Sequence, residues 1–301
     1  IDAIVQISNE LNVSPWVCIP HGASDEYVTN FATYILDNLN QNLICVFEYT
    51  NEDWNSAAGF AQTQWSQKKA LARWGLASED RWYGYRFYQV MDIVDAVFAG
   101  QPHRRHRFFG HRPSSARYEG TGTGVPAMPI TKADSTGVAS YIYPDSGVAG
   151  LADAEQIWTW KFGTEAEKQA SFDWLDGHFR GTSNSNHSWS VGYVINTWWP
   201  QLKTYRDTYS ALIGRELEMR QYEAGFGALV NTYTLTASSW NGDAITTTDR
   251  DDWFFAYHQS EQFGLTTQYH LMAWRDFGGL YPSQYALASQ WTNGGQWGLR
   301  S

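Results

Sequence analysis

Two glutamates stand just after predicted buried strands, where acids can carry out chemistry in a parallel α/β fold. Glu52 comes after the strand predicted near residues 43–49, and Glu223 comes after the strand predicted near residues 217–222. The carboxyl ends of parallel strands line the ligand-binding edge of such folds, so both side chains are expected there. A pair of carboxyl groups can cleave a glycosidic bond: one protonates the leaving oxygen, and the other attacks the anomeric carbon or activates water. Because the chain has 31 acidic residues, position alone leaves solvated loop acids as the alternative.

The residues around each glutamate narrow this choice. Residues 48–55 read Glu-Tyr-Thr-Asn-Glu-Asp-Trp-Asn, and residues 221–225 read Gln-Tyr-Glu-Ala-Gly. The run at 48–55 resembles the strand-4 motif of clan A of the glycoside hydrolases, which are retaining (β/α)8-barrel enzymes. The run at 221–225 resembles the strand-7 motif of the same clan. Residues 15–55 are also similar to a poorly characterised branch found in large secreted polysaccharide-active proteins, and this similarity implies an extracellular or secreted protein.

The resemblance implies catalytic roles for the residues that match these motifs. Glu52 would be the general acid/base and Glu223 the nucleophile. Asn51 would hydrogen-bond the sugar 2-hydroxyl, a contact that strengthens in the transition state. Tyr143 would hold the nucleophile ionised and oriented, although Tyr141 competes for that register. A retaining mechanism further implies that the two carboxyl groups stand about 5–5.5 Å apart.

Three more residues match substrate-binding positions of the clan. Trp274 would end the last strand and form the floor under the cleaved sugar, and His21 matches the polar position that ends strand 3. Trp54 lies beside the proposed acid/base. For His21 and Trp54 the alternative is that both side chains simply pack the mouth of the barrel.

The elements that would position these residues alternate along the chain. Apolar runs predict strands near residues 15–20, 43–49, 106–110, 137–143, 217–222 and 265–273. Helical periodicity predicts helices over 24–39, 78–98, 153–162, 165–179, 189–213, 249–263 and 282–290. The strands read as buried runs, which is typical of a parallel sheet in one α/β domain over residues 1–301. The resemblance makes this a (β/α)8 TIM-type barrel that is N-terminally incomplete, because its first two strands are not found and residue 1 already lies in helical periodicity.

Composition favours carbohydrate over other partners. A formal net charge of −10 disfavours nucleic acid, and no apolar run is long enough for a membrane span. The chain holds 16 Trp, 18 Tyr and 15 Phe, more than a core needs, and aromatic faces are surfaces on which sugar rings stack. The insertions at 53–77 and 144–214 are Trp-rich enough to build sugar subsites. No residue spacing indicates a metal site, and no cofactor motif is present.

Several features admit other interpretations. Cys18 and Cys45 each lie in an apolar run, which favours buried thiols over a disulfide. Residues 103–118 hold five Arg and three His without an acid, and we interpret them as a solvated rim loop. The absence of two strands favours another function, a catalytically silent barrel that binds carbohydrate or serves as an extracellular matrix glycoprotein. A protein-interaction domain would explain the aromatic residues but not the paired motifs.

Overall fold

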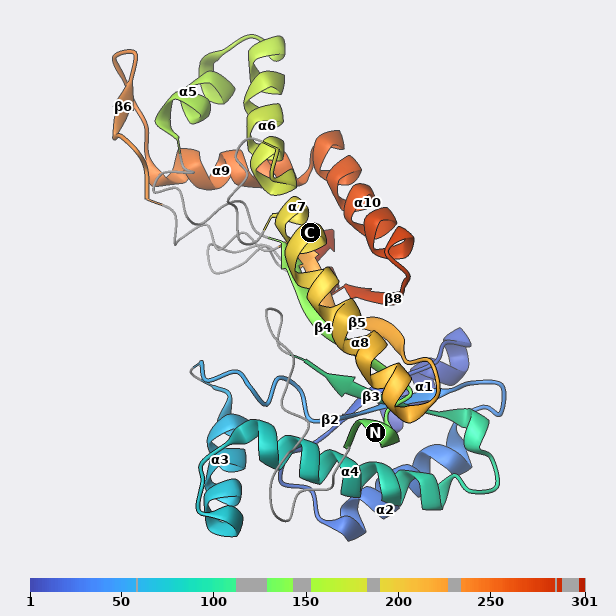
Figure 1. Ribbon diagram of the computed structural model, residues 1–301. Helices are drawn as coiled ribbons and strands as arrows, with labels where there is room; N and C mark the ends of the chain where they lie inside the picture. Colours follow the sequence, from blue (N-terminus) through green and yellow to red (C-terminus); the bar gives the residue numbers. More distant parts are fainter. Residues whose placement is uncertain are drawn as a thin grey trace. The chain divides into compact units, whose positions relative to one another are not determined.

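A computed structural model describes residues 1–57, 59–111, 129–142, 153–182, 190–226, 234–284, 286–288 and 298–300. The chain is a mixed α/β protein with a six-stranded sheet in the order β1–β2–β3–β4–β5–β8 (Figure 1). These strands are β1 (Trp16–Ile19), β2 (Cys45–Tyr49), β3 (Arg105–Gly110), β4 (Ser135–Ile142), β5 (Glu218–Phe226) and β8 (Gly279–Gln284). Neighbouring strands from β1 to β4 pair in parallel. The parallel α/β class is confirmed, and a closed barrel stays a prediction.

Five of the six strands lie where the apolar runs predict them, and the sixth does not. Residues 265–273 belong to helix α10 (Glu261–Asp276), and the last strand of the sheet is β8. The helix predicted over 282–290 is also wrong, because β8 and the short strand β9 (Ala286–Ala288) occupy its described residues. The buried residues of α10 explain the first error. They recur at helical spacing but include the polar Thr266 and His270 beside Phe263 and Trp274.

The chain divides into two compact units, residues 1–138 with 202–219 and residues 139–201 with 220–301. The first unit contains β1 to β3, and its helices are α1 (Asp2–Leu11), α2 (Asp25–Asn38), α3 (Ala61–Trp74) and α4 (Glu79–Val97). Its short 3-10 turns are η1 (Pro102–Arg104) and η2 (Pro129–Lys132). Helix α8 (Trp199–Ile213) crosses the boundary between the units. The single domain predicted over residues 1–301 stays a prediction.

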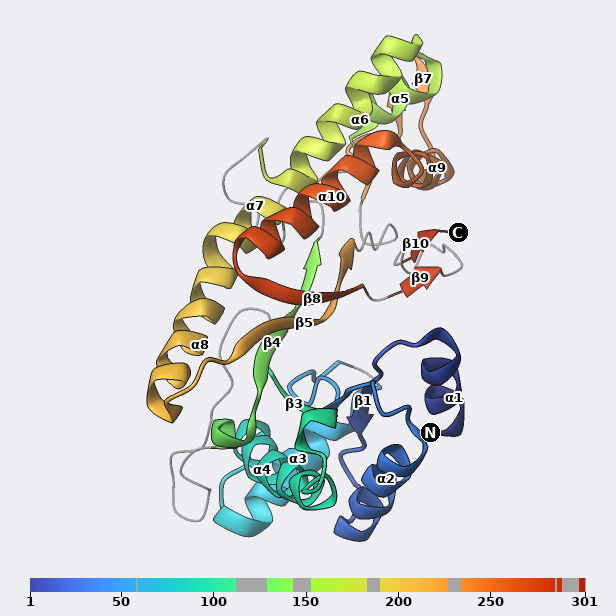
Figure 2. The ribbon, with the colours of Figure 1, turned by 90° about the vertical axis from the view of Figure 1, so that its right-hand side faces the viewer.

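The core of the first unit lies between one face of its strands and the helices α2 and α4 (Figure 2). Alternate strand residues such as Val17, Phe47 and Phe109 point to this face and are at most 3% exposed. The helices begin at the predicted residues, since the Ser24 hydroxyl accepts from the Tyr27 N–H and the Ser78 hydroxyl accepts from the Arg81 N–H.

The opposite face of the same strands carries a buried carboxylate. Glu48 is 2% exposed, and its Oε2 accepts a hydrogen bond from Trp16 Nε1 at 2.9 Å and lies 3.5 Å from Cys18 Sγ. Neither Cys18 nor Cys45 forms a disulfide, as expected. Cys45 is buried, which raises the pKa of its thiol, but Cys18 is exposed, so its predicted burial is wrong. The thiol of Cys18 lies on the strand face that the helices leave uncovered.

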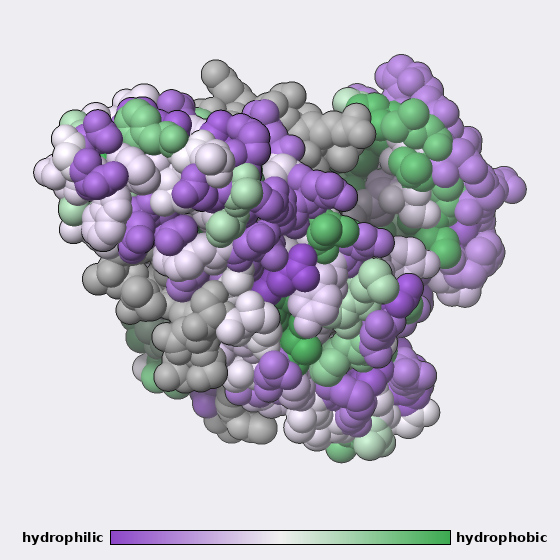
Figure 3. All heavy atoms as spheres, turned by 90° about the horizontal axis from the view of Figure 1, so that it is seen from above, coloured by the Kyte–Doolittle hydropathy of each residue, from purple (hydrophilic) through white to green (hydrophobic). Residues whose placement is uncertain are grey.

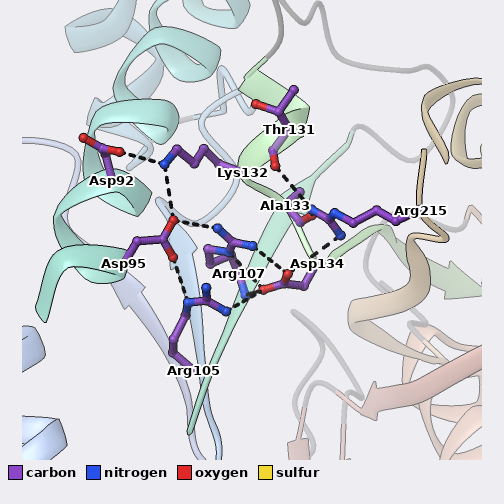
Figure 4. A network of polar contacts seen from close by, with 9 residues as sticks. All are labelled: Asp92, Asp95, Arg105, Arg107, Thr131, Lys132, Ala133, Asp134 and Arg215. Carbon is purple, nitrogen blue, oxygen red and sulfur yellow. Dashed lines mark hydrogen bonds and ion pairs between the residues drawn. The ribbon is translucent and has the colours of Figure 1, made fainter. Parts of the chain in front are cut away.

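The described part of the basic segment is an ion network and not a solvated loop (Figure 4). Arg107 of β3 donates to Asp134 at 2.7 and 3.0 Å and pairs with Asp95 of α4 at 2.7 Å. Arg105 pairs with Asp95 at 2.7 Å, and Arg215 lies 3.8 Å from Asp134. Burial alone raises the pKa of Asp134, but the hydrogen bonds and charge of Arg107 outweigh it and hold that pKa below its ordinary value. Residues 112–118 lie outside the described part.

The network extends to a surface lysine, and a neighbouring arginine closes the end of a helix. Lys132 pairs with Asp92 at 2.7 Å and with Asp95 at 3.3 Å. Arg104, 2% exposed, donates to the carbonyl of Leu36 at 3.1 Å and to that of Leu39 at 2.5 Å, which satisfies the end of α2. The arginines at and just before the start of β3 therefore serve folding.

The second unit consists of the later part of the sheet and a group of helices. Its helices are α5 (Ala154–Phe162), α6 (Glu165–Arg180), α7 (Val191–Tyr193), the π-helical turn η3 (Val194–Trp198), α9 (Thr247–His258) and α10. A hairpin joins β6 (Ser239–Trp240) to β7 (Asp243–Ala244), and β10 (Gly298–Arg300) pairs with β9. Asp176 of α6 holds the helices together, because it accepts from Tyr257 of α9 at 2.8 Å, pairs with Arg180 at 2.6 Å and accepts from Thr266 of α10.

Two buried histidines lie in the aromatic core of this unit. His258 contacts Phe263 at 4.5 Å between ring centroids, and His270 lies 5.6 Å from Trp199 and 5.8 Å from Phe226. Neither ring nitrogen of His270 has a hydrogen-bond partner in the described part of the chain. Burial lowers the pKa of each histidine from 6.5 to about 4, and for His258 it outweighs the opposing hydrogen bond to the Phe254 carbonyl. Both rings are therefore neutral at physiological pH.

Large apolar side chains also reach the surface in a few places. One face of the molecule shows green hydrophobic groups gathered among hydrophilic purple ones (Figure 3). On α1, Ile4, Ile7 and Leu11 are 42%, 54% and 67% exposed, while Val5 faces the core. None of the helices described here has the length and apolarity that a membrane crossing requires.

Candidate active site

Glu52 lies in a turn that follows β2, as its position after an apolar run predicts. The turn holds Glu52 at a φ of 45°, in the left-handed region that a residue with a Cβ rarely adopts. The side chain is 8% exposed, and its Oε2 accepts a hydrogen bond from Asn55 Nδ2 at 2.9 Å. Backbone strain of this kind costs about 1–3 kcal/mol and is concentrated at functional sites. A conformation of this kind persists only where the surrounding residues fix it.

Helix α3 holds this turn in place. Three side chains near its start donate hydrogen bonds to the turn: Gln62 to the Asn51 carbonyl at 2.9 Å, Thr63 to the Asn55 carbonyl at 2.5 Å and Ser66 to Asp53 Oδ1 at 2.6 Å. Asp53 is fully buried. Sequence reasoning missed both α3 and Asp53, since the residues that α3 buries are Thr63, Ser66 and Ala70. Small polar side chains of this kind give no apolar periodicity from which a helix could be predicted. For Asp53, the one sequence signal was its position next to Glu52.

His21 and Trp54 lie in the same unit as Glu52. His21 follows β1, the strand next to β2, and its carbonyl accepts a hydrogen bond from the Tyr49 hydroxyl at 3.1 Å. The imidazole is half-buried and lies 5.7 Å from the ring of Trp65 on α3. Trp54 is half-buried within the turn that contains Glu52. His21, Asn51, Glu52 and Trp54 thus come from two loops that follow adjacent parallel strands.

Glu223 lies in the carboxyl half of β5, in the second unit. Its Oε2 accepts a hydrogen bond from the Tyr141 hydroxyl of β4. Of the two registers considered for this tyrosine, the structure therefore pairs Tyr141 with the carboxylate. Tyr143 lies outside the described residues. A phenol that donates to a carboxylate favours its ionised form and fixes its orientation.

Trp274 lies in a different setting from the one predicted. It belongs to α10, is 1% exposed and packs edge-on against Trp199 with ring centroids 4.9 Å apart. Its indole N–H donates to the Leu280 carbonyl at 3.3 Å. The prediction that Trp274 ends a strand is therefore wrong, and this position was the basis of its predicted substrate-binding role. Its burial is typical of a core residue.

The first unit supplies an acid, an amide and an imidazole, and the second unit supplies an acid and a phenol, which are groups capable of acid–base and nucleophilic chemistry. Among the described residues, we find no group of three or more His, Cys, Asp or Glu side chains that could hold a metal ion. Glu52 has a polar partner on its own turn, and Glu223 has a partner on the adjacent strand. The two carboxyl groups, each within its own unit, thus have different surroundings.

Comparison with known proteins adds one distant likeness. No protein family matches the sequence, and no curated protein matches it significantly. Among solved structures, a β-glucosidase from Thermotoga maritima in complex with deoxynojirimycin is similar to the chain, with 11% sequence identity and a TM-score of 0.42. The likeness covers 99% of this chain and 71% of that one. A likeness this distant establishes neither a shared fold nor a shared activity.

Proposed function

We propose that the chain is a retaining glycoside hydrolase that cleaves β-glycosidic bonds of a polysaccharide or oligosaccharide. The observation that carries this proposal is the hydrogen bond from the Tyr141 hydroxyl to Glu223 Oε2. A nucleophilic carboxylate must be ionised and aimed at the anomeric carbon, and a phenol donor meets both needs. The motif around Glu223 supports the same role independently.

Glu52 is the general acid/base of the proposed reaction. In the first step its proton passes to the glycosidic oxygen while Glu223 forms an ester bond to the anomeric carbon and the leaving sugar departs. In the second step Glu52 takes a proton from water, whose oxygen displaces Glu223 from the same carbon. The left-handed backbone of Glu52 and the grip of α3 on its turn support a fixed acid at this position. Asn51 would bind the sugar 2-hydroxyl beside it.

Removal of the nucleophile is the decisive test. Glu223→Ala should lose activity on β-linked oligosaccharides by a factor of at least about 10⁴, and azide should restore cleavage with inverted product configuration. The variant Glu218→Ala changes a glutamate at the other end of the same strand and should leave the rate unchanged. Full activity of Glu223→Ala would overturn the assignment.

Removal of the acid tests the second role separately. Glu52→Ala should lose oligosaccharide cleavage but still react with a glycosyl fluoride, because fluoride leaves without protonation. Oligosaccharide binding by the unmodified protein without any hydrolysis of either substrate would favour the silent carbohydrate-binding barrel instead.

A further inference from the structure

Trp65 is the exposed aromatic residue of the helix that holds the Glu52 turn. Its side chain is 37% exposed. Gln62, three residues before Trp65, donates a hydrogen bond to the Asn51 carbonyl. Ser66, the residue after Trp65, donates one to the Asp53 carboxylate. Residues three apart lie on neighbouring positions of a helix surface, so the indole projects beside the contacts that fix this turn.

Two neighbours fix the orientation of the indole without burying it. The His21 ring meets it edge-on at 5.7 Å between centroids, with an interplanar angle of 65°. The ammonium of Lys69, one turn along α3, lies 4.5 Å from the centroid of the indole ring. A cation over the ring and an aromatic edge beside it restrain the side chain, and such cation contacts are worth about 0.5–1 kcal/mol at exposed sites.

Other tryptophans of the first unit are engaged differently. Trp16 donates its indole N–H to Glu48, and its ring contacts Phe108 at 4.6 Å. Trp74 and Trp82 are half-buried and lie 6.3 Å apart in a cluster with Tyr85. Trp65 instead presents a restrained aromatic surface to solvent beside a loop that follows β1.

We propose that Trp65 and His21 form a binding subsite for a sugar ring on the leaving-group side of the cleaved bond. The flat indole would stack on the C–H face of a pyranose, and a ring nitrogen of His21 would hydrogen-bond one of its hydroxyls. The assignment to the leaving-group side rests on the proposed function. If Glu52 protonates the glycosidic oxygen, the sugar that carries this oxygen lies against the unit that holds Glu52. The preferred substrate is therefore an oligosaccharide or polysaccharide with a sugar beyond the cleaved bond, and not a glycoside with a small leaving group.

The test compares two β-configured substrates that differ on the leaving-group side. A tetrasaccharide, taken from a panel of gluco-, manno- and xylo-tetraoses, places sugars there, whereas the corresponding glycosyl fluoride places one atom there. Trp65→Ala should raise KM and lower kcat/KM for the tetrasaccharide by tenfold or more, with fluoride hydrolysis within twofold of the unmodified protein. Trp65→Phe should recover part of the loss. Trp240→Ala, which removes a tryptophan 41% exposed on the β6–β7 hairpin, should change neither rate.

An equal loss on both substrates, or no loss on the tetrasaccharide, would overturn the subsite while leaving the hydrolase intact. If the unmodified protein cleaves neither substrate, the proposed function fails, and calorimetric titration with the same tetrasaccharides decides the binding site alone. Binding that Trp65→Ala abolishes and Trp240→Ala preserves would support a sugar site at Trp65 and His21. Binding that both variants preserve, or no binding at all, would overturn it.

Discussion

An ion cluster in the first unit and a pair of histidines in the second unit are accommodated in opposite ways. Around Asp134, four cations and three carboxylates satisfy one another through hydrogen bonds and ion pairs. In the helical part of the second unit, His258 and His270 are buried as neutral rings among aromatic side chains. The first arrangement needs its groups charged, and the second needs them uncharged. The two regions should therefore respond differently to acid.

Acidification should produce the largest difference between them. His258 and His270 have folded pKa values of about 4 against 6.5 for an ordinary histidine, so the unfolded state binds more protons between these values. The free energy of unfolding is therefore independent of these two rings above pH 6.5 and falls as the pH drops toward 4, by up to about 3 kcal/mol for each ring. Asp134 has a lowered pKa, so its contribution is lost only at still lower pH.

Hydrogen exchange read by mass spectrometry at pH 6.5 and pH 4.5, corrected for intrinsic exchange, measures this difference. Amides of α9 and α10 should lose protection while those of β3 and α4 keep theirs. Equal loss in both regions would remove the contrast.

The second largest effect should come from Asp134→Ala. This change removes one of the two carboxylates that Arg107 and Arg105 share in a part-buried site, and breaking such a pair costs about 3 kcal/mol. Urea unfolding followed by tryptophan fluorescence measures it. Asp92→Ala is the matched control, because the Asp92 side chain is 64% exposed and its pairing with Lys132 should contribute less than about 1 kcal/mol. Equal shifts for the two variants would mean that burial does not strengthen this network.

The smallest effect should come from His270→Leu. Leucine has a similar volume and no ring nitrogens to leave without partners, so the variant should be about 1 kcal/mol more stable at pH 7. It should also lose part of the acid sensitivity of α10. Thermal unfolding at pH 7 and pH 5 measures both. His258→Leu gives the comparison, since it also removes the bond to the Phe254 carbonyl and should gain less. A less stable His270→Leu protein would contradict this account of the buried ring.

The sequence predicts the parallel strands best where burial on both faces leaves a continuous apolar run. Residues 43–47 are such a run, and β2 lies on them. The same reasoning fails for α10, where β-branched and aromatic residues suggest a strand but Ser260 caps a helix by accepting from the Phe263 N–H. It fails for α3 because the core-facing side chains of that helix are small and polar. A hydrophobic pattern therefore reveals the elements that bury apolar side chains and misses those that bury polar ones.

Prediction of the site has the same limit. The sequence pattern predicts the position of Glu52 after β2. Its left-handed backbone, and the hydrogen bonds by which Gln62 and Ser66 hold its turn, depend on tertiary contacts. Alternation along β4 leaves two tyrosines possible, and only the neighbouring strand shows that Tyr141 reaches Glu223. The roles assigned to Glu52, Glu223, Asn51, His21 and Trp54 stay predictions.

The left-handed backbone at Glu52 sets activity against stability. Glycine adopts a φ of 45° without a Cβ penalty, so Glu52→Gly would relieve strain while it removes the proposed acid. A descendant of this protein that no longer needed the proposed acid would gain stability by such a change. If the proposed role of Glu52 is right, the identity of this residue in divergent copies is a record of selection, because glutamate would persist only where the carboxyl group is used.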